Sequence, residues 1–146
     1  MEHRSLPKRF WANYREAVRR NFRKEHLDRY VVAAESAGLS VTLDSCRGFR
    51  GRVETWSIPW PEIASIVAFK TDNLTYDTIW VTIFTSNADQ APADAAFPDE
   101  ALGWLPVLEA LPQHLPGCEP FESWFTEVAF PAFAENGRLI FQRAAA

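Results

Sequence analysis

A pair of strand-like segments in the middle of the chain constrains its fold more than any other feature. Segments 63–69 and 78–84 are rich in β-branched and aromatic residues, and the polar stretch 71–75 between them is typical of a hairpin loop. Two sets of side chains alternate along the second segment: Ile79, Val81 and Ile83 on one side, and Trp80, Thr82 and Phe84 on the other. Because both sets are bulky, we expect this strand to lie centrally in a sheet that is covered on both faces.

Three shorter extended segments precede this hairpin. The strand candidates are 30–34, 39–43 and 53–58, with turns predicted at 37–38 and 47–52. Trp56, Ile58 and Trp60 share one face of an extended run, but Pro59 and Pro61 are poorly compatible with a continuous central strand. We therefore expect the chain to bend near Trp60.

The segment after the hairpin is predicted to be helical. The stretch 86–96, rich in Ala, Asp and Asn, is typical of a connector. Pro98-Asp99-Glu100 then has the composition of a helix start, and stretch 112–117 is expected to end that helix. Its predicted apolar residues are Leu102, Leu105, Leu108 and Leu111.

A second helix and a final strand complete the predicted core. Apolar residues recur at helical spacing over 119–128, and Pro131 is expected to stop this helix. Asn136-Gly137 is a turn signal, and segment 139–141 is predicted to return as a short last strand.

The N-terminal segment has the pattern of a basic amphipathic helix. Between residues 6 and 27, one apolar stripe comprises Phe10, Trp11, Tyr14, Val18 and Phe22. The rest of the helix surface is largely basic, with Arg15, Arg19, Arg20, Arg23 and Lys24. Such a stripe packs on its own domain, on a second copy, on a protein partner or on a membrane surface, and we take it as the predicted partner-binding surface.

These elements predict an α+β fold. An N-terminal amphipathic helix at 1–28 precedes a single α+β domain at 29–146, which is expected to contain an antiparallel sheet or partial barrel, two helices and a short final strand. The length of 146 residues suits one hydrophobic core.

Charge is distributed unevenly along the chain. Residues 1–30 carry a formal charge of +5, residues 31–60 are neutral and residues 61–146 carry -9, within a total of -4. This asymmetry indicates either that the basic segment docks on acidic surface of the same chain or a second copy, or that it binds an anionic partner.

Three stretches of the chain resemble a family of small bacterial proteins of unknown function with a pleckstrin-homology-like core. They are 58–63 (IPWPEI), 66–72 (IVAFKTD) and 76–79 (YDTI); Gly103-Trp104, 115–117 (LPG) and 130–133 (FPAF) with Asn136 are similar to its C-terminal part. The resemblance covers about 30–143 and implies a pleckstrin-homology-like sheet, with no catalytic residues to transfer. The basic segment lies outside it, and the connector 86–96 departs from the acidic strand expected there.

One polar cluster is predicted at the central hairpin. Lys70, Asp72 and Asp77 lie near its loop, close enough for a lysine–carboxylate pair. Two carboxylates can perform acid–base chemistry, but catalysis needs a cleft and a metal site needs more ligands. We interpret the cluster as structural.

A second candidate is the arginine-rich loop. Arg47, Arg50 and Arg52 flank Phe49 in a glycine-containing stretch, and guanidinium groups suit phosphate, carboxylate or RNA backbone. The pattern is not a nucleotide-binding loop, because it lacks the Gly-Lys-Ser/Thr ending. We interpret the loop first as an ordinary solvated turn, and we keep Arg47, Arg50 and Arg52 as the candidate anion-binding residues of the alternative.

The remaining residues suggest no catalytic or metal site. The three histidines are scattered, and Cys46 and Cys118 lie outside any metal-binding or nucleophile motif. We therefore expect no cofactor, no metal and two reduced thiols. The sequence also shows neither a secretory signal nor a long apolar run, so we expect a cytoplasmic protein.

Three functions are then open, in decreasing order of support. The first is a noncatalytic interaction module that uses the N-terminal helix to self-associate or to hold a protein partner. The second is a binder of nucleic acid or acidic membrane through the arginines of the helix and loop. The third is a small enzyme that uses Asp72, Asp77 or Glu100.

Overall fold

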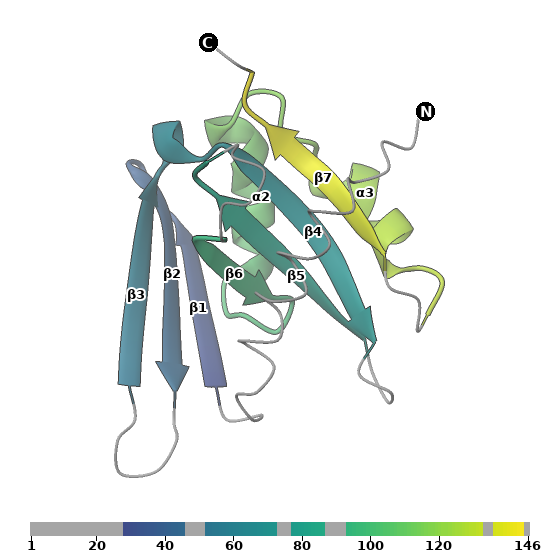
Figure 1. Ribbon diagram of the computed structural model, residues 1–146, viewed down its shortest axis with the longest axis horizontal. Helices are drawn as coiled ribbons and strands as arrows, with labels where there is room; N and C mark the ends of the chain where they lie inside the picture. Colours follow the sequence, from purple (N-terminus) through teal and green to yellow (C-terminus); the bar gives the residue numbers. More distant parts are fainter. Residues whose placement is uncertain (1–27, 46–51, 73–76, 87–92, 133–135, 145–146) are drawn as a thin grey trace.

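The computed structural model describes residues 28–45, 52–72, 77–86, 93–132 and 136–144. Within them the chain forms two antiparallel sheets and two α-helices, which confirms the α+β class and the C-terminal strand (Figure 1). The predicted N-terminal helix lies outside the described residues. In the described part of the chain, no helix is long and apolar enough to cross a membrane.

The first sheet is a three-stranded meander. It comprises β1 (Asp28–Ala34), β2 (Gly38–Ser45) and β3 (Arg52–Pro59). Leu39, Val41 and Leu43 face the core, as their alternation predicts. The β1–β2 turn requires glycine at position 38, because a Cβ there would lie 2.2 Å from the carbonyl oxygen of Ile58.

The predicted bend after β3 is a single turn of 3-10 helix. This element, η2 (Trp60–Glu62), begins directly after Pro59. The Trp60 indole nitrogen donates a hydrogen bond to the carbonyl oxygen of Glu35 at 2.8 Å, and its ring stacks on His114 at 4.4 Å. The turn therefore redirects the chain from the first sheet into the second.

The second sheet has the order β6-β5-β4-β7. It contains β4 (Ser65–Asp72), β5 (Asp77–Phe84), β6 (Ala95–Pro98) and β7 (Gly137–Gln142). The β4–β5 hairpin and the central position of β5 follow the sequence prediction, and both faces of β5 are buried. β7 returns from the C-terminal part of the chain to pair with β4.

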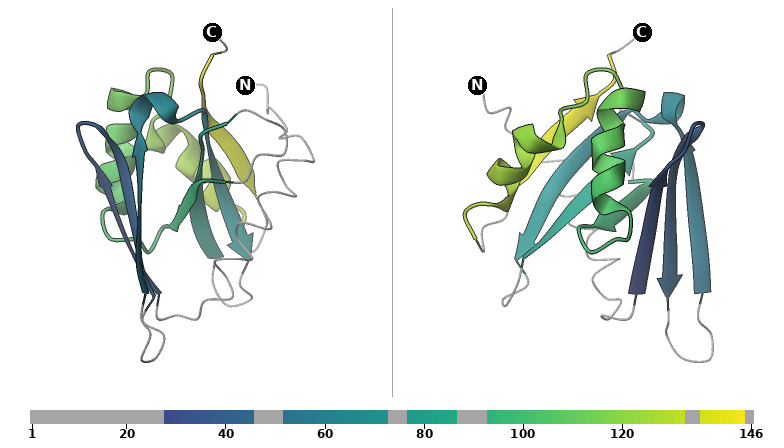
Figure 2. Two further views of the ribbon diagram at one scale, coloured as in Figure 1. Left: turned by 60° about the vertical axis from the view of Figure 1, so that its left-hand side comes forward. Right: turned by 180° about the vertical axis from the view of Figure 1, so that it is seen from behind.

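Both described helices lie on the same face of the four-stranded sheet. They are α2 (Trp104–His114) and α3 (Phe121–Ala129), seen behind the sheet in Figure 1 and in front of it in the right-hand view of Figure 2. Phe97 of β6 meets Trp104 of α2 edge to face, and Lys70 of β4 reaches the end of α3. We call this side the helix face.

The two sheets join where β1 passes the segment before α2. The Val32 backbone N–H donates to the Leu102 carbonyl at 2.8 Å, and the Leu102 N–H donates to the Tyr30 carbonyl at 2.9 Å. Gly103 follows with a φ of 87°, and a Cβ on it would lie 2.1 Å from the Val32 carbonyl oxygen. This junction corrects the predicted helix start, because Pro98, Asp99 and Leu102 precede α2.

One further prediction near the helices was wrong at its boundary. The connector 86–96 ends earlier than expected, because Ala95 and Ala96 pair with Ile83 and Thr82 as part of β6. The helix α2 ends at His114, within the stretch 112–117 that was predicted to end it. The second predicted helix and the final strand agree with α3 and β7.

Candidate functional site

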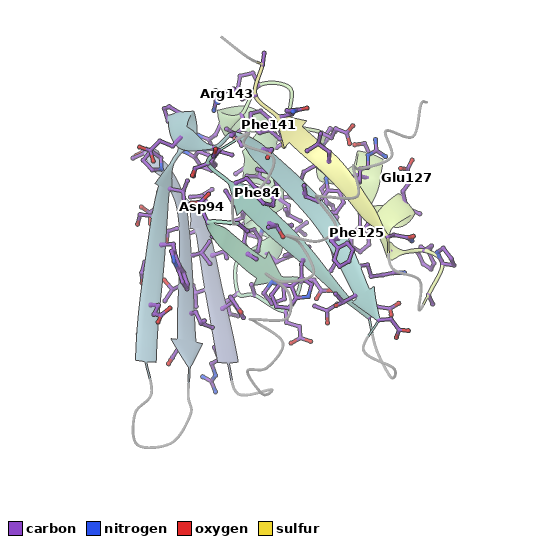
Figure 3. The ribbon with its side chains drawn as sticks, viewed as in Figure 1. Phe84, Asp94, Phe125, Glu127, Phe141 and Arg143 are labelled. Atoms are coloured by element: carbon purple, nitrogen blue, oxygen red, sulfur yellow. The ribbon has the colours of Figure 1, made fainter. Side chains whose placement is uncertain are left out.

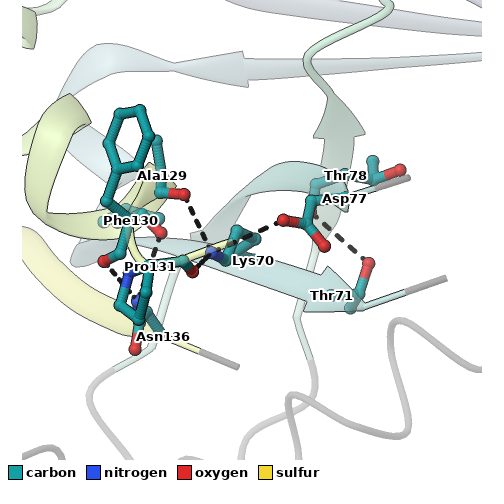
Figure 4. Close-up of polar contacts among 9 residues, drawn as sticks. Lys70, Thr71, Asp77, Thr78, Ala129, Phe130, Pro131 and Asn136 are labelled. Atoms are coloured by element: carbon teal, nitrogen blue, oxygen red, sulfur yellow. Dashed lines mark hydrogen bonds and ion pairs between the residues drawn. The ribbon is translucent and has the colours of Figure 1, made fainter. Parts of the chain in front are cut away.

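A buried lysine is the centre of the polar cluster at the central hairpin. The Lys70 side chain is 1% exposed on the helix face of β4. Its Nζ donates hydrogen bonds to the carbonyl oxygens of Ala129, at 2.8 Å, and Pro131, and it lies 3.6 Å from Asp77 Oδ2 (Figure 4). These three partners match the three N–H groups of a lysine ammonium.

The lysine fastens the end of α3 to the sheet. Asn136 completes the arrangement, because its side chain donates to the Phe130 carbonyl at 2.8 Å and its own carbonyl accepts from the Lys70 backbone N–H at 2.8 Å (Figure 4). Asp72 lies opposite Asp77 in the strand register, with an exposed side chain. The structure thus brings Lys70 and Asp77 together in a contact within the chain, where the ammonium is bonded to two backbone carbonyls and paired with a carboxylate.

A second cation, Arg138, ties β7 to α3. Its Nε lies 2.8 Å from Glu119 Oε2, and its Nη1 pairs with Glu127. Hydrogen bonding to Glu119, with a further bond to Glu127, raises the pKa of Arg138 above its ordinary value. The guanidinium is therefore engaged by two carboxylates of the same chain.

The third cation, Arg143, holds the chain after β7 against η2. Its Nε donates to the Ile63 carbonyl at 2.9 Å and its Nη2 to the Trp60 carbonyl at 2.8 Å, while its guanidinium lies 5.6 Å from the centre of the Phe141 ring (Figure 3). An open surface depression of about 330 Å³ lies beside it, lined by Pro61, Glu62, Ile63, Ala64, Thr85 and Arg143.

Two polar residues that line this depression, Thr85 and Arg143, already have partners in the chain. Asp94 Oδ2 accepts hydrogen bonds from the Thr85 backbone N–H at 2.6 Å and from the Thr85 hydroxyl at 2.8 Å. Two guanidinium nitrogens of Arg143 donate hydrogen bonds to backbone carbonyls. The depression is open, and its Thr85 and Arg143 side chains are already hydrogen-bonded within the chain. It therefore does not define a ligand site.

Two titratable groups are shifted by their surroundings. Burial, together with the charge of Glu100, raises the pKa of Asp99 to about 6. Burial and the neighbouring Glu119 carboxylate raise the pKa of the Cys118 thiol to about 12, which keeps the thiol protonated and unreactive. The described residues contain no cluster of three metal-ligating side chains.

The other predicted site residues fall outside the described part of the chain. The stripe of Phe10, Trp11, Tyr14, Val18 and Phe22 does so, as do Arg47 and Arg50, whereas Arg52 begins β3. The structure therefore neither supports nor contradicts the two predicted binding surfaces, the apolar stripe and the arginine-rich loop.

The structure adds an apolar surface that the sequence analysis did not single out. Cross-strand pairing puts five residues on the side of the four-stranded sheet opposite the helix face: Val67, Phe69, Trp80, Thr82 and Phe84. All five are buried, although α2 and α3 both contact the other side. We call these five residues the front face, and the alternation along β5 was the signal that could have located it.

A small exposed apolar pair lies where the two sheets meet. Val31 and Leu102 are bridge partners, and their side chains are 43% and 67% exposed. Isolated exposed apolar residues are ordinary on protein surfaces, and a pair of this size indicates no particular partner.

Comparisons of the chain with protein-family models, with curated proteins and with solved structures found no match. The function must therefore be argued from the chain itself.

Proposed function

We propose that this chain is a noncatalytic interaction module of the cytoplasm. In this proposal the domain 29–146 is a pleckstrin-homology-like scaffold, and the segment 1–28 is its recognition element, which binds a protein partner or a second copy. The proposal extends the sequence argument and adds no cofactor and no metal.

The observation that carries the proposal is the contrast between polar and apolar surfaces. Each of the three cations after residue 60, Lys70, Arg138 and Arg143, is bonded to acceptors of its own chain. The front face, by contrast, is an apolar layer that is buried although neither described helix lies on it. The apolar stripe at Phe10–Phe22 is therefore the surface that the proposal assigns to a partner or a second copy.

The fold supports the scaffold part of the proposal. A three-stranded antiparallel meander is followed by a second antiparallel sheet, α3 packs against β4 and β7 of that sheet, and α2 packs against β1 of the first. The α+β class is the one expected from the resemblance to proteins with a pleckstrin-homology-like core. Fold alone assigns no ligand, so the binding role rests on the surfaces.

A second candidate function is binding to nucleic acid or to an acidic membrane surface. The arginines proposed for it are Arg19, Arg20, Arg23, Arg47, Arg50 and Arg52. It is favoured by the position of the basic charge, because residues 1–30 carry +5 and the cations of the C-terminal part are engaged internally. Such binding weakens steeply with added salt.

The enzyme hypothesis has the least support. Asp77 lies 3.6 Å from the buried Lys70 ammonium, and Asp72 is exposed at the end of its strand. Asp99 and Glu100 follow β6, and no nucleophile motif accompanies them. Catalysis would need a cleft that brings such groups together, and the depression beside Arg143 contains none of these carboxylates.

The experiment that tests the proposal measures association of the full chain. Multi-angle light scattering over a range of protein concentrations reports self-association, and capture from lysate followed by mass spectrometry identifies a stoichiometric partner. We expect Val18→Asp, on the stripe, to abolish the association and Ala12→Asp, on another side of the predicted helix, to preserve it.

Two outcomes would contradict the interaction proposal. A chain that stays monomeric and captures no protein would remove its basis. Recovery of RNA or binding to anionic vesicles, lost on adding salt and in Arg20→Gln, would favour the second function instead.

A further inference from the structure

The four-stranded sheet is an apolar layer that is buried on both sides. On the helix face, Phe97 and Lys70 meet α2 and α3. On the front face, Val67 and Thr82 are 1% and 0% exposed, which is as buried as any residue on the helix face. Among the described residues, neither helix lies on the front face, so its cover has to come from a different element of this chain.

The segment before β1 ends next to the front face. Residue 27 precedes Asp28, the first residue of β1, and the ring of Tyr30 meets the ring of Trp80 edge to face at 6.0 Å. Trp80 belongs to the front face. A segment that ends at residue 27 therefore reaches the front face without any linker.

The dimensions of the segment match those of the face. A helix over residues 6–27 would be about 33 Å long, and its apolar stripe from Phe10 to Phe22 would span about 18 Å. Four strands about 4.8 Å apart span about 14 Å between the outer two, and strands of eight residues are about 27 Å long. One helix of about 10–12 Å diameter, laid across the strands, would cover most of the roughly 14 Å of strand that the five front-face residues occupy.

The charges of the two partners are opposite. The segment 1–30 carries +5, and the part of the chain that forms the four-stranded sheet belongs to the stretch with -9. Asp94, which bonds to Thr85 just after β5, adds an exposed acidic residue beside this sheet. Basic residues beside the stripe would be attracted to the net negative charge of this part of the chain.

We propose that residues 6–27 form a helix that covers the front face of the same chain. In this arrangement the apolar stripe packs against Val67, Phe69, Trp80, Thr82 and Phe84. The assignment goes beyond the proposed function, since it holds for a chain with no partner. It also implies that partner binding is regulated, because a partner and the front face would compete for the same apolar stripe.

Protection of a thiol placed on the front face tests this assignment in the full chain. Thr82→Cys introduces a side chain of similar size at a buried position, in a Cys46→Ser background that leaves only the buried Cys118. We expect slow reaction of Cys at 82 with a thiol reagent, and a rate about tenfold or more higher when Val18→Asp is added. Ala12→Asp, the matched control, leaves the rate unchanged.

Disulfide formation identifies which copy supplies the helix. Thr82→Cys is combined in turn with Tyr14→Cys, Val18→Cys and Phe22→Cys, with Glu16→Cys as the control on the opposite side of the predicted helix. A disulfide within one chain for at least one stripe position, and none for Glu16→Cys, supports the proposal. Disulfide-linked dimers would assign the helix to a second copy and overturn it.

Two more results would also overturn the proposal. One is rapid reaction of Cys at 82 in the chain with an unaltered stripe, which would show that the front face is open. The other is protection that persists in Val18→Asp, which would show that something else covers the face. Failure of the interaction function is a separate result, because it concerns mass and partner capture rather than thiol protection.

Discussion

The Nζ atom of Lys70 lies 2.8 Å from the carbonyl oxygen of Ala129, a residue 59 positions further along the chain. This contact joins the centre of a sheet to the last turn of a helix. Because the lysine is buried and also bonds to Pro131 and faces Asp77, removing its charge leaves three groups without their partner. The lysine holds the C-terminal part of the fold in place.

Lys70→Met is therefore expected to destabilise the protein strongly. The substitution keeps much of the side-chain volume but removes the donor, so two carbonyls and the Asp77 carboxylate lose their partner. We expect the free energy of unfolding to fall by about 3 kcal/mol or more, as measured by urea denaturation. Asp72→Asn, on the exposed side chain of the same hairpin, is the control and should change it by less than about 0.5 kcal/mol. A loss below about 1 kcal/mol for Lys70→Met would show that the contact contributes little.

Thr82→Val, by contrast, is expected to raise the free energy of unfolding. The Thr82 hydroxyl oxygen is fully buried on the front face and has no hydrogen-bond partner in the described part of the chain. Valine has nearly the same shape without the polar group, so the free energy of unfolding should rise by about 1 kcal/mol. Thr42→Val is the matched control on the first sheet, where the hydroxyl of Thr42 bonds to that of Thr55 at 3.2 Å. Destabilisation by Thr82→Val would indicate an acceptor for its hydroxyl.

The pattern of the sequence was sufficient for the elements whose side chains alternate or repeat strongly. It located β1 to β5, α3 and β7, because their apolar residues recur with the period of a strand or a helix. It missed β6, since four residues with two alanines carry no alternation. It also placed the start of α2 too early, because Leu102 pairs with β1, a tertiary contact that local periodicity does not report.

The polar cluster around Lys70 was also predicted only in part. The spacing of Lys70, Asp72 and Asp77 was enough to predict a structural polar cluster. The main partners of the lysine are backbone carbonyls of Ala129 and Pro131, and a backbone acceptor has no sequence signature. Long-range placement of α3 was therefore necessary to see that the lysine fastens a helix.

Stability should depend on pH through Asp99. Its pKa is about 6 in the folded protein, against 3.8 for an unperturbed aspartate, so ionisation of this carboxyl opposes folding. Its contribution to stability is therefore greatest below about pH 4, declines as the pH rises, and reaches its minimum above about pH 6. Because the carboxyl is partly solvated, we expect a loss of about 1 kcal/mol across this window.

Asp99→Asn is the variant that isolates this effect. It should remove the decline between pH 4 and pH 6 seen in urea denaturation, whereas Glu109→Gln, on an exposed residue of α2, should leave the decline in place. An identical pH dependence in Asp99→Asn would assign the decline to other groups.

Cys118 should behave as an inert core residue. Its side chain is 6% exposed, and burial with the nearby Glu119 charge raises the pKa of its thiol to about 12. Since the thiolate is the reactive species, a Cys46→Ser chain should react with a disulfide reagent at pH 8 only as fast as the protein opens, and should react completely in denaturant. Lys70→Met provides the internal comparison, because a less stable fold opens more often and should expose the thiol sooner. Immediate reaction of the native chain would place Cys118 at an accessible surface and contradict its assignment to the core.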